Sequence, residues 1–440
     1  SYSDTINPAS YRCVFDYGNW IYSAGVVQPG VSDCITATKT PVGDPTPLSP
    51  QVVDEAAAQP LATHRWWGSV AFLGEMQLGD ANSAAYITPD PITARVNNRG
   101  VRIMGIPSGL NTTSDGFMYA IPDPFSEVFD GMAVGSSINT DLQAFAKDHS
   151  DGSITVQWQS NNEPVLEATF VHGSPYIYFK ALEGDLVLKT LRENGGEKGV
   201  FYNAENSLGV WTSVAGNHNN FLITGEGSTT FTNVDGNTIT ASNTAGEFTV
   251  ALLPQTAGEP NTAMTTFFAQ YARNVVDSVR VDYSIDRSDN SVSVTHAYLN
   301  RDGNEIETLA GMFPLHWKNS TTTTSNYKVR SARGMIKFAP TTSFSYELPY
   351  IGVLPTMPTL PDSMDTAKLT QLVNEFVNTP ESTWNTRNGE TQRDAYWSGK
   401  NFAKVAELLA IADTAGLTVQ KAKLLTYLKA ELEDWFTAET

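Results

Sequence analysis

Alternation of apolar and polar side chains along 61–346 is the feature that most limits what this chain can fold into. In the stretch SITVQWQ, the apolar Ile154, Val156 and Trp158 alternate with polar residues, which is the period-two pattern of a half-buried strand. The same pattern recurs in PYIYFKA, FLITGEG, EFTVALL and SVRVDYSID, and turn sequences such as VDGN and RSDN separate neighbouring segments as in antiparallel hairpins. No fixed repeat period is present, so a propeller is not expected. The sequence predicts a mainly β fold, a large antiparallel β-sandwich, with one helix near 263–275.

After Pro358 the pattern changes from strand-like alternation to three amphipathic helices. Either Ser363 or Asp365 is suited to cap the first helix, and Gly416 is placed to end the second. The predicted buried faces of the three helices are Leu369, Leu372, Val373, Phe376 and Val377; Tyr396, Phe402, Val405, Leu408, Leu409 and Ala412; and Val419, Ala422, Leu425, Leu428, Leu432 and Trp435. These faces need more partners than three helices supply. We therefore expect the chain to stop inside a helical domain.

These changes in composition predict four parts: an N-terminal extension (1–60), the β-sandwich (61–346), a connector (347–362) and the start of an α-helical domain (363–440). The extension contains TPVGDPTPLSP, a turn-rich segment typical of a linker. It also holds the only two cysteines, Cys13 and Cys34, whose closeness favours a local disulfide over two free thiols. Disulfides persist in exported proteins, so a secreted, extracellular location is expected.

The charge balance argues against two classes of partner. The 440 residues carry a formal net charge of −19, whereas binding to nucleic acid or to an anionic membrane needs clustered Lys and Arg. No apolar run reaches the roughly 18 residues of a membrane-spanning helix. An acidic surface suits a neutral substrate such as a polysaccharide, and it serves solubility equally well.

Motifs for several catalytic classes are missing from the sequence. There is no Gly-x-Ser-x-Gly elbow, phosphate-binding loop, dinucleotide glycine fingerprint or HExxH zinc helix. The six histidines are scattered without metal-ligand spacing, so no metal site is expected. They are His64, His149, His172, His218, His296 and His316.

Aromatic residues are numerous, and their flat faces can bind the apolar faces of sugar rings. Most of them fit equally well into a sandwich core. Tyr396 and Trp397 are better candidates for a binding surface, because adjacent helix positions point in different directions and full burial of both is not expected. Asp394 and Lys400 lie beside them in the sequence and add polar groups to this surface.

Five segments spread over 61–436 point to a known family: LATHRWWGSVAF, ATFVHGSPYIYF, LPYIGVLPTMP, RDAYWSGKNFAKVAELLAIADTAG and LKAELEDWF. Taken in this order, they resemble glycoside hydrolase family 81, the endo-β-1,3-glucanases or laminarinases. The fourth segment is similar to the family's Asp-x-Tyr-Trp-x-Gly-Lys helix. One departure is FPLHW, where the family shows Pro-His-His and only Pro314 and His316 match.

The resemblance implies a β-sandwich followed by an (α/α)6 toroid, hydrolysis of internal β-1,3-glucosidic bonds, and no cofactor. It also implies an inverting mechanism, in which one carboxylic acid protonates the leaving oxygen and a second carboxylate activates water. The family's Asp-x-His-x-His-Tyr-Gly segment and its pair of catalytic glutamates have no counterpart here. We therefore expect an incomplete toroid, with the acid and base beyond Thr440 and a missing C-terminal catalytic part as partner.

By the same resemblance, β-1,3-glucan is the expected substrate, and one wall of its cleft is expected to contain Asp394, Tyr396, Trp397 and Lys400. Packing between toroid helices explains Tyr396 and Lys400 equally well.

Sandwich loops around His172 or His316 are further candidates for the cleft wall. The alternative function is a non-catalytic β-glucan-binding or structural surface protein that retains only the sandwich.

Overall fold

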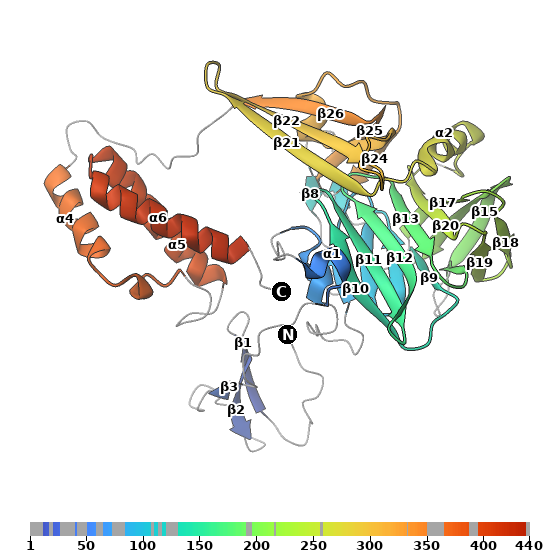
Figure 1. Cartoon of the computed structure of the whole chain (residues 1–440), viewed down its shortest axis with the longest axis horizontal. Helices are drawn as coiled ribbons and strands as arrows, with labels where there is room; N and C mark the ends of the chain where they lie inside the picture. The colour runs from blue at the N-terminus through green and yellow to red at the C-terminus, as the bar shows by residue number, and fades with distance from the viewer. Residues whose placement is uncertain are drawn as a thin grey trace.

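The structure is a computed structural model of the whole chain (Figure 1). It describes residues 12–16, 21–26, 40–41, 51–58, 65–72, 84–106, 110–112, 117–119, 131–190, 196–214, 217–255, 258–331, 333–349, 365–386 and 395–436. The predicted fold class is confirmed, since the chain is mainly β with antiparallel sheets followed by a few C-terminal helices.

Two large antiparallel sheets form the sandwich. The eight-stranded sheet has the order β10 (Leu142–His149), β11 (Ser153–Ser160), β12 (Glu163–Val171), β13 (Tyr176–Ala181), β20 (Glu247–Leu253), β17 (Asn217–Gly225), β16 (Ser207–Val214) and β15 (Glu197–Ala204). The seven-stranded sheet has the order β18 (Thr230–Thr232), β19 (Thr238–Ser242), β14 (Leu186–Lys189), β9 (Met132–Ser136), β6 (Gly100–Met104), β5 (Thr93–Asn97) and β4 (Ala84–Ile87). The strands predicted from alternation are therefore present.

The core between these sheets follows from the alternation. Ile154, Val156 and Trp158 on β11 are all 0% exposed, and they pack with Val96 and Ile103 of the facing sheet. The indole nitrogen Nε1 of Trp158 donates a 2.7 Å hydrogen bond to the carbonyl oxygen of Asn97 at the end of β5. A single buried side chain thus joins the two sheets and satisfies its own polar atom.

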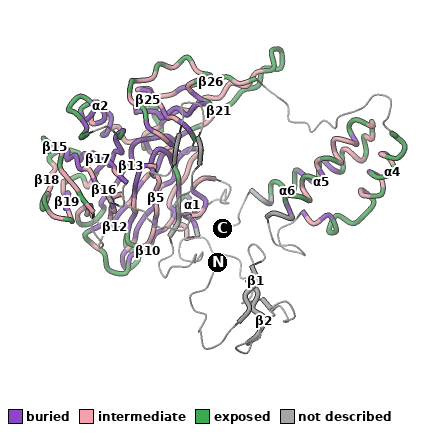
Figure 2. The backbone as a smooth tube through the Cα atoms, turned by 180° about the vertical axis from the view of Figure 1, so that it is seen from behind, coloured by how far each residue is buried: buried purple, intermediate pink, exposed green. Residues whose placement is uncertain are grey.

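A third layer covers part of the outer face of the eight-stranded sheet. The sequence predicted its helix but not that the helix belongs to such a layer. Helix α2 (Thr262–Ala272) lies against β17 and β20, close to the helix expected near 263–275 (Figure 1). A three-stranded sheet packs beside it, in the order β23 (Thr308–Met312), β25 (Gly334–Thr341) and β24 (Lys328–Ser331). Tyr176 on β13 is buried beneath this layer, and its hydroxyl donates to the carbonyl oxygen of Phe268 on α2 at 2.7 Å. Strands β13, β17 and β20 are therefore buried on both faces, and Figure 2 shows β13 and β17 largely in purple.

Three strands form another sheet, in the order β21 (Ser278–Asp286), β22 (Ser291–Leu299) and β26 (Ser343–Pro349). Its apolar residues share one face, because Tyr283 pairs with Val294 and Val294 pairs with Tyr346. The inner end of this face is buried, and Tyr283 at the outer end is 74% exposed.

The remaining described elements are short or lie near the chain ends. They are β1 (Arg12–Asp16), β2 (Ile21–Val26), β3 (Thr40–Pro41), α1 (Asp54–Ala57), η2 (Gly68–Phe72), β7 (Leu110–Thr112), β8 (Phe117–Tyr119), α3 (Pro314–Lys318) and η3 (Glu381–Thr383). Residues 51–53 pair with β10, since the backbone N–H of Val53 donates to the carbonyl oxygen of Ala146 at 2.9 Å.

The C-terminal helices are α4 (Thr366–Val377), α5 (Ala395–Thr414) and α6 (Thr418–Phe436). Asp365 is the N-cap of α4, because its carboxylate accepts a 2.9 Å hydrogen bond from the backbone N–H of Lys368. Gly416 follows α5 with a φ of +69°, a conformation that favours glycine. No helix among the described residues is long and apolar enough to cross a membrane.

Part of the predicted helical burial is wrong. Val419 is 76% exposed and Leu425 38% exposed, whereas Leu424 and Tyr427 are buried in the helix cluster. Leu432 at 41% and Leu372 on α4 at 45% are also exposed. Helix α6 turns the row that holds Leu424 and Tyr427 toward α4 and α5. Of the predicted row, Leu428 is buried and the others are exposed, except that the side chain of Trp435 lies outside the described residues.

Candidate functional site

The substrate-binding residues predicted from the sequence fall at the start of α5. Tyr396 and Trp397 are in its first turn, but their side chains lie outside the described residues, as does Asp394 altogether. Lys400 is exposed one turn further on. Because side chains three and four positions apart share a helix face, Lys400 is placed beside both aromatic positions. The four residues remain predictions.

The disulfide prediction also lies outside what the structure describes. Cys13 is in β1, of whose side chains nothing is described, and Cys34 is outside the described residues.

Three histidines that are far apart in the sequence meet at one end of the sandwich. The ring centroids of His296 and His316 are 5.2 Å apart, and His172 stacks on Phe313 at 5.0 Å. We call this group the histidine–aromatic cluster, and its members are Trp66, His172, His296, Phe313, His316, Phe344 and Tyr346. In the sequence these histidines are scattered and no regular spacing relates them. Only the possible role of His172 and His316 in a cleft wall pointed to this place.

The turn between β12 and β13 positions His172. The backbone N–H of His172 donates to the carbonyl oxygen of Gly152 at 2.8 Å, and that of Gly173 donates to the carbonyl oxygen of Pro89 at 2.7 Å. Gly173 has a φ of +81°, and a Cβ atom there would lie 2.7 Å from the carbonyl oxygen of Gly311 on β23. Glycine is therefore required for this turn to pack against the third layer.

Helix α3 brings His316 into the cluster from the FPLHW segment. Pro314 occupies the first turn, where its missing N–H costs no hydrogen bond. The backbone N–H of Phe313 points at Nδ1 of His316 at 3.4 Å, so Nδ1 is the acceptor and Nε2 carries the proton of the neutral ring. The ring of His316 stacks on Tyr346 at 4.7 Å.

Burial keeps all three imidazoles neutral. It lowers the pKa of His172 to about 3 and that of His316 to about 3, with smaller contributions from neighbouring cationic groups. Burial also lowers the pKa of His296 to about 4, although the nearby Asp151 carboxylate opposes this. Nε2 of His172 is buried and has no hydrogen-bond partner among the described residues. Neutral imidazoles can both donate and accept hydrogen bonds, which suits an uncharged ligand rich in hydroxyl groups.

An ion pair borders the cluster. Nε of Arg333 lies 3.3 Å from the carboxylate of Asp90, which is 4% exposed, and the guanidinium is 5.9 Å from the centre of the Phe313 ring. Burial raises the pKa of Asp90 to about 6, although Arg333 pulls it downward. This carboxyl faces Arg333, so its role here is to hold the exposed guanidinium over the aromatic ring.

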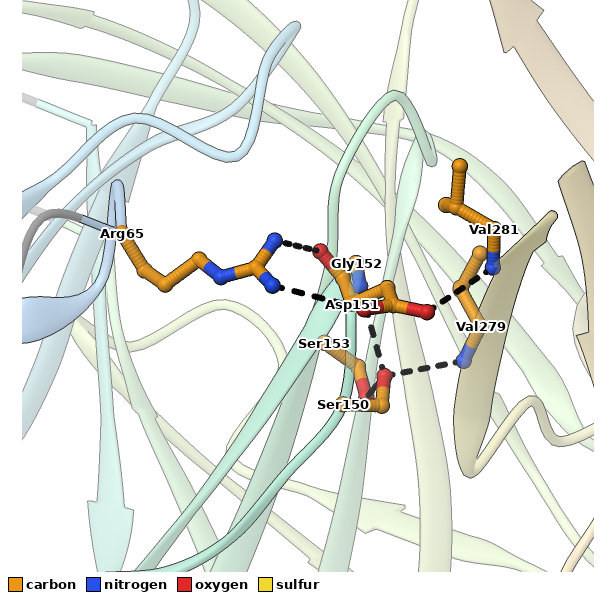
Figure 3. Close-up of polar contacts among 7 residues, drawn as sticks. All are labelled: Arg65, Ser150, Asp151, Gly152, Ser153, Val279 and Val281. Carbon is orange, nitrogen blue, oxygen red and sulfur yellow. Dashed lines mark hydrogen bonds and ion pairs between the residues drawn. The ribbon is translucent and has the colours of Figure 1, made fainter. Parts of the chain in front are cut away.

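The turn between β10 and β11 joins three parts of the fold next to the cluster (Figure 3). The carboxylate of Asp151 accepts a 2.9 Å hydrogen bond from the backbone N–H of Val281 on β21, and its other oxygen lies 3.4 Å from Arg65, the residue before Trp66. Ser150 accepts a 3.0 Å hydrogen bond from the backbone N–H of Val279. The turn therefore holds both the tryptophan segment and the strand that pairs with His296.

Replacing Asp151 by Ala is expected to lower the free energy of unfolding by about 1–2 kcal/mol. The main cost is the unpaired N–H of Val281, because the Arg65 ion pair is more than a third exposed and contributes little. Asp151→Asn keeps an acceptor and should cost less.

Asp282→Ala is the matched control for Asp151→Ala. It removes an exposed pair with Arg280 and should change the free energy by less than about 0.5 kcal/mol. Urea unfolding of the three variants measures both effects. Equal values for the alanine variants at Asp151 and Asp282 would contradict the role assigned to the turn.

Among the described residues, no group of three or more His, Cys, Asp and Glu side chains is arranged to hold a metal ion. The histidine–aromatic cluster offers indole, imidazole and phenol groups, and Arg333 at its border adds a guanidinium that is ion-paired with Asp90. These groups can stack on a sugar ring and bond its hydroxyls. Phe313, His316 and Phe344 are at most 9% exposed, so a ligand could contact only the partly exposed Trp66, His172, His296 and Tyr346, together with Arg333.

Comparisons with known proteins agree with the fold and the motifs. No family model matches the chain. A glucan endo-1,3-beta-D-glucosidase from Thermobifida fusca is 26% identical over 94% of this chain and 50% of its own length, and a protein of the same name from Acetivibrio thermocellus is 27% identical over 69% and 38%. A solved structure of glycoside hydrolase family 81 from Clostridium thermocellum covers 97% of this chain, with a TM-score of 0.61 and 23% identity. The resemblance to glycoside hydrolase family 81 is confirmed.

The family 81 likeness extends over both the sandwich and the C-terminal helices. The solved family 81 chain is covered to 53% of its length, so this chain spans about half of that structure and at most half of the curated relatives. At 23% identity, the structural likeness shows the family 81 fold and says nothing of individual side chains.

Proposed function

We propose that this chain is the sandwich and first helices of an endo-β-1,3-glucanase. Its substrate is a β-1,3-glucan such as laminarin, and the reaction is hydrolysis of internal glucosidic bonds with inversion. The observation that carries the proposal is similarity along 94% of the chain to a curated glucan endo-1,3-beta-D-glucosidase. The family 81 fold is consistent with it.

In this proposal the general acid and general base are supplied by residues outside these 440. Inversion needs two carboxyl groups roughly 6.5–9.5 Å apart, with room for a water molecule between the second one and the sugar. Two carboxylates border the histidine–aromatic cluster, and each is in an ion pair: Asp90 with Arg333, and Asp151 with Arg65. The length of the relatives leaves room for a further catalytic part.

The glucan would be held by two sets of residues in this chain. The first is the predicted set at the start of α5: Asp394, Tyr396, Trp397 and Lys400. The second is the histidine–aromatic cluster with Arg333, whose uncharged rings fit a neutral polysaccharide. Neither set requires a metal ion or an organic cofactor for binding.

The proposal is tested on the native protein and on the 440-residue chain in parallel. Antibodies against the sandwich would isolate the native species, and release of reducing ends from laminarin would be measured for both. We expect turnover by a native polypeptide longer than 440 residues, with products in the α-anomeric form by proton NMR, and no turnover by the chain alone. Trp397→Ala in the active species should raise KM more than it lowers kcat.

Two results would contradict this scheme. Hydrolysis of laminarin by the 440-residue chain would place the acid and base inside it. A native species of 440 residues that binds laminarin without turnover would instead favour the alternative, a non-catalytic β-glucan-binding or structural surface protein.

Export and a Cys13–Cys34 disulfide are part of the same proposal. A polymeric substrate is degraded outside the cell, where disulfides persist. Recovery of the native protein from the culture medium, with no free thiol on titration after unfolding, is the expected result. Two titratable thiols would contradict the disulfide.

A further inference from the structure

A tryptophan lies flat on the outer face of the eight-stranded sheet, at the border of the third layer and outside its apolar core. Trp211 on β16 is paired with Gly199 on β15, and a Cβ atom at Gly199 would lie 2.3 Å from Nε1 of the indole. The missing side chain of Gly199 therefore makes the space in which the ring rests. Phe201 lies over Gly209 in the same way, since a Cβ atom there would lie 2.4 Å from its ring.

A second ring and three polar side chains surround this tryptophan. His218 on β17 stacks beside it, with ring centroids 5.4 Å apart and planes inclined by 27°. Nε1 of Trp211 donates a 3.0 Å hydrogen bond to the exposed carboxylate of Glu259. Gln255 donates to the carbonyl oxygen of His218 at 2.7 Å and accepts from Arg330 at 3.1 Å.

The arrangement differs from core packing in two respects. Trp211 and His218 are only half-buried, and the bonds made by Glu259, Gln255 and Arg330 are at the exposed surface. The indole nitrogen is already bonded to Glu259, so the ring is held in one orientation before any ligand arrives. A pre-oriented flat ring beside carboxylate, amide and guanidinium groups can stack on a pyranose ring and bond its hydroxyls at little entropic cost.

We infer that Trp211, His218, Gln255, Glu259 and Arg330 form a second carbohydrate-binding site, separate from the histidine–aromatic cluster. The inference rests on the proposed function for its ligand, a β-1,3-glucan chain. Trp211 provides the stacking surface, and Glu259, Gln255 and Arg330 form hydrogen bonds with the equatorial hydroxyls of the sugar. A site of this kind holds a polymer on the sandwich without taking part in bond cleavage.

The test is binding of the 440-residue chain to laminarin, measured by affinity electrophoresis in native gels, with xylan and a soluble cellulose derivative run beside it. Trp211→Ala is expected to weaken binding at least about tenfold, as for a central stacking residue. Gly199→Ala keeps the tryptophan but displaces it, and it should weaken binding in the same direction. Tyr283→Ala, a change of another exposed aromatic residue, is the matched control and should leave binding unchanged.

Hydrogen exchange locates the ligand independently of the variants. A laminari-oligosaccharide should protect amides in 207–214, and this protection should vanish in Trp211→Ala. Wild-type affinity and unchanged exchange in both site variants would overturn the inference. Binding of xylan or the cellulose derivative through Trp211, without binding of laminarin, would uphold the site and contradict the β-1,3-glucan assignment.

Discussion

Lowering the pH from 7 to 5 is expected to lower the free energy of unfolding of this protein by roughly 4 kcal/mol. His172, His296 and His316 have pKa values of about 3, 4 and 3 in the folded chain, against an ordinary value of 6.5. Below pH 6.5 the unfolded chain therefore binds up to three protons that the folded chain does not. Each contributes about 1.4 kcal/mol of lost stability per pH unit down to its folded pKa.

Asp90 opposes part of this loss. Its pKa is raised from 3.8 to about 6, so between those values the folded chain binds the extra proton and gains stability as the pH falls. The stability gained by protonating this one carboxyl offsets about the loss from one of the three histidines. The gain begins only near pH 6. The net direction between pH 7 and pH 5 is a loss of stability.

Guanidinium unfolding at pH 7 and pH 5 measures this difference directly. His296→Phe keeps the stacking on Phe344, where the rings are 4.9 Å apart and nearly parallel, and removes one titrating group. Its stability should fall less steeply toward pH 5 than that of the wild type. Equal unfolding free energies at the two pH values in the wild type would show that the cluster is not buried as described.

Gly311→Ala is expected to destabilise the protein by about 3 kcal/mol. A Cβ atom on Gly311 would lie 1.8 Å from the carbonyl oxygen of Gly173 and 3.0 Å from Cγ2 of Ile336. The clash is with backbone, so β23 and the turn between β12 and β13 would have to move apart. Because that turn carries His172, the variant should also weaken laminarin binding.

Gly399→Ala is the control for this change, because a Cβ placed there would meet no described atom within 4 Å apart from those of its chain neighbours and its own helix backbone. It is in α5, where alanine favours helix formation, so its stability should be unchanged or higher by up to about 1 kcal/mol. Thermal and urea unfolding of both variants provide the measurement. A Gly311→Ala protein as stable as the wild type would mean that the third layer does not contact the turn so closely.

Much of the fold could be predicted from the sequence because strand alternation is a local signal. The 153–160 strand, the hairpin turns and the N-cap at Asp365 each depend on residues close together in the chain. The third layer could not be predicted, because alternation tells which residues can face a core and not which element covers the second face. The buried face of α6 was predicted wrongly for the same reason. Several rows of side chains on α6 are apolar enough to be buried, and contact with α4 and α5 determines which row is buried.

The histidine–aromatic cluster shows this limit most clearly. The sequence contains His172, His296 and His316 without any spacing that relates them, and only folding brings a turn, a strand and a short helix together at their side chains. The same holds for Trp211, whose flat position depends on a glycine in the neighbouring strand.

By itself, the sequence determined the mainly β class, the helical C-terminal part and the resemblance to family 81, because each follows from residues read along the chain. The tertiary structure alone decided which side chains lie together, which imidazoles are kept neutral and where a partly exposed aromatic ring is held flat on the sheet. These properties depend on burial and on contacts between segments far apart in the chain.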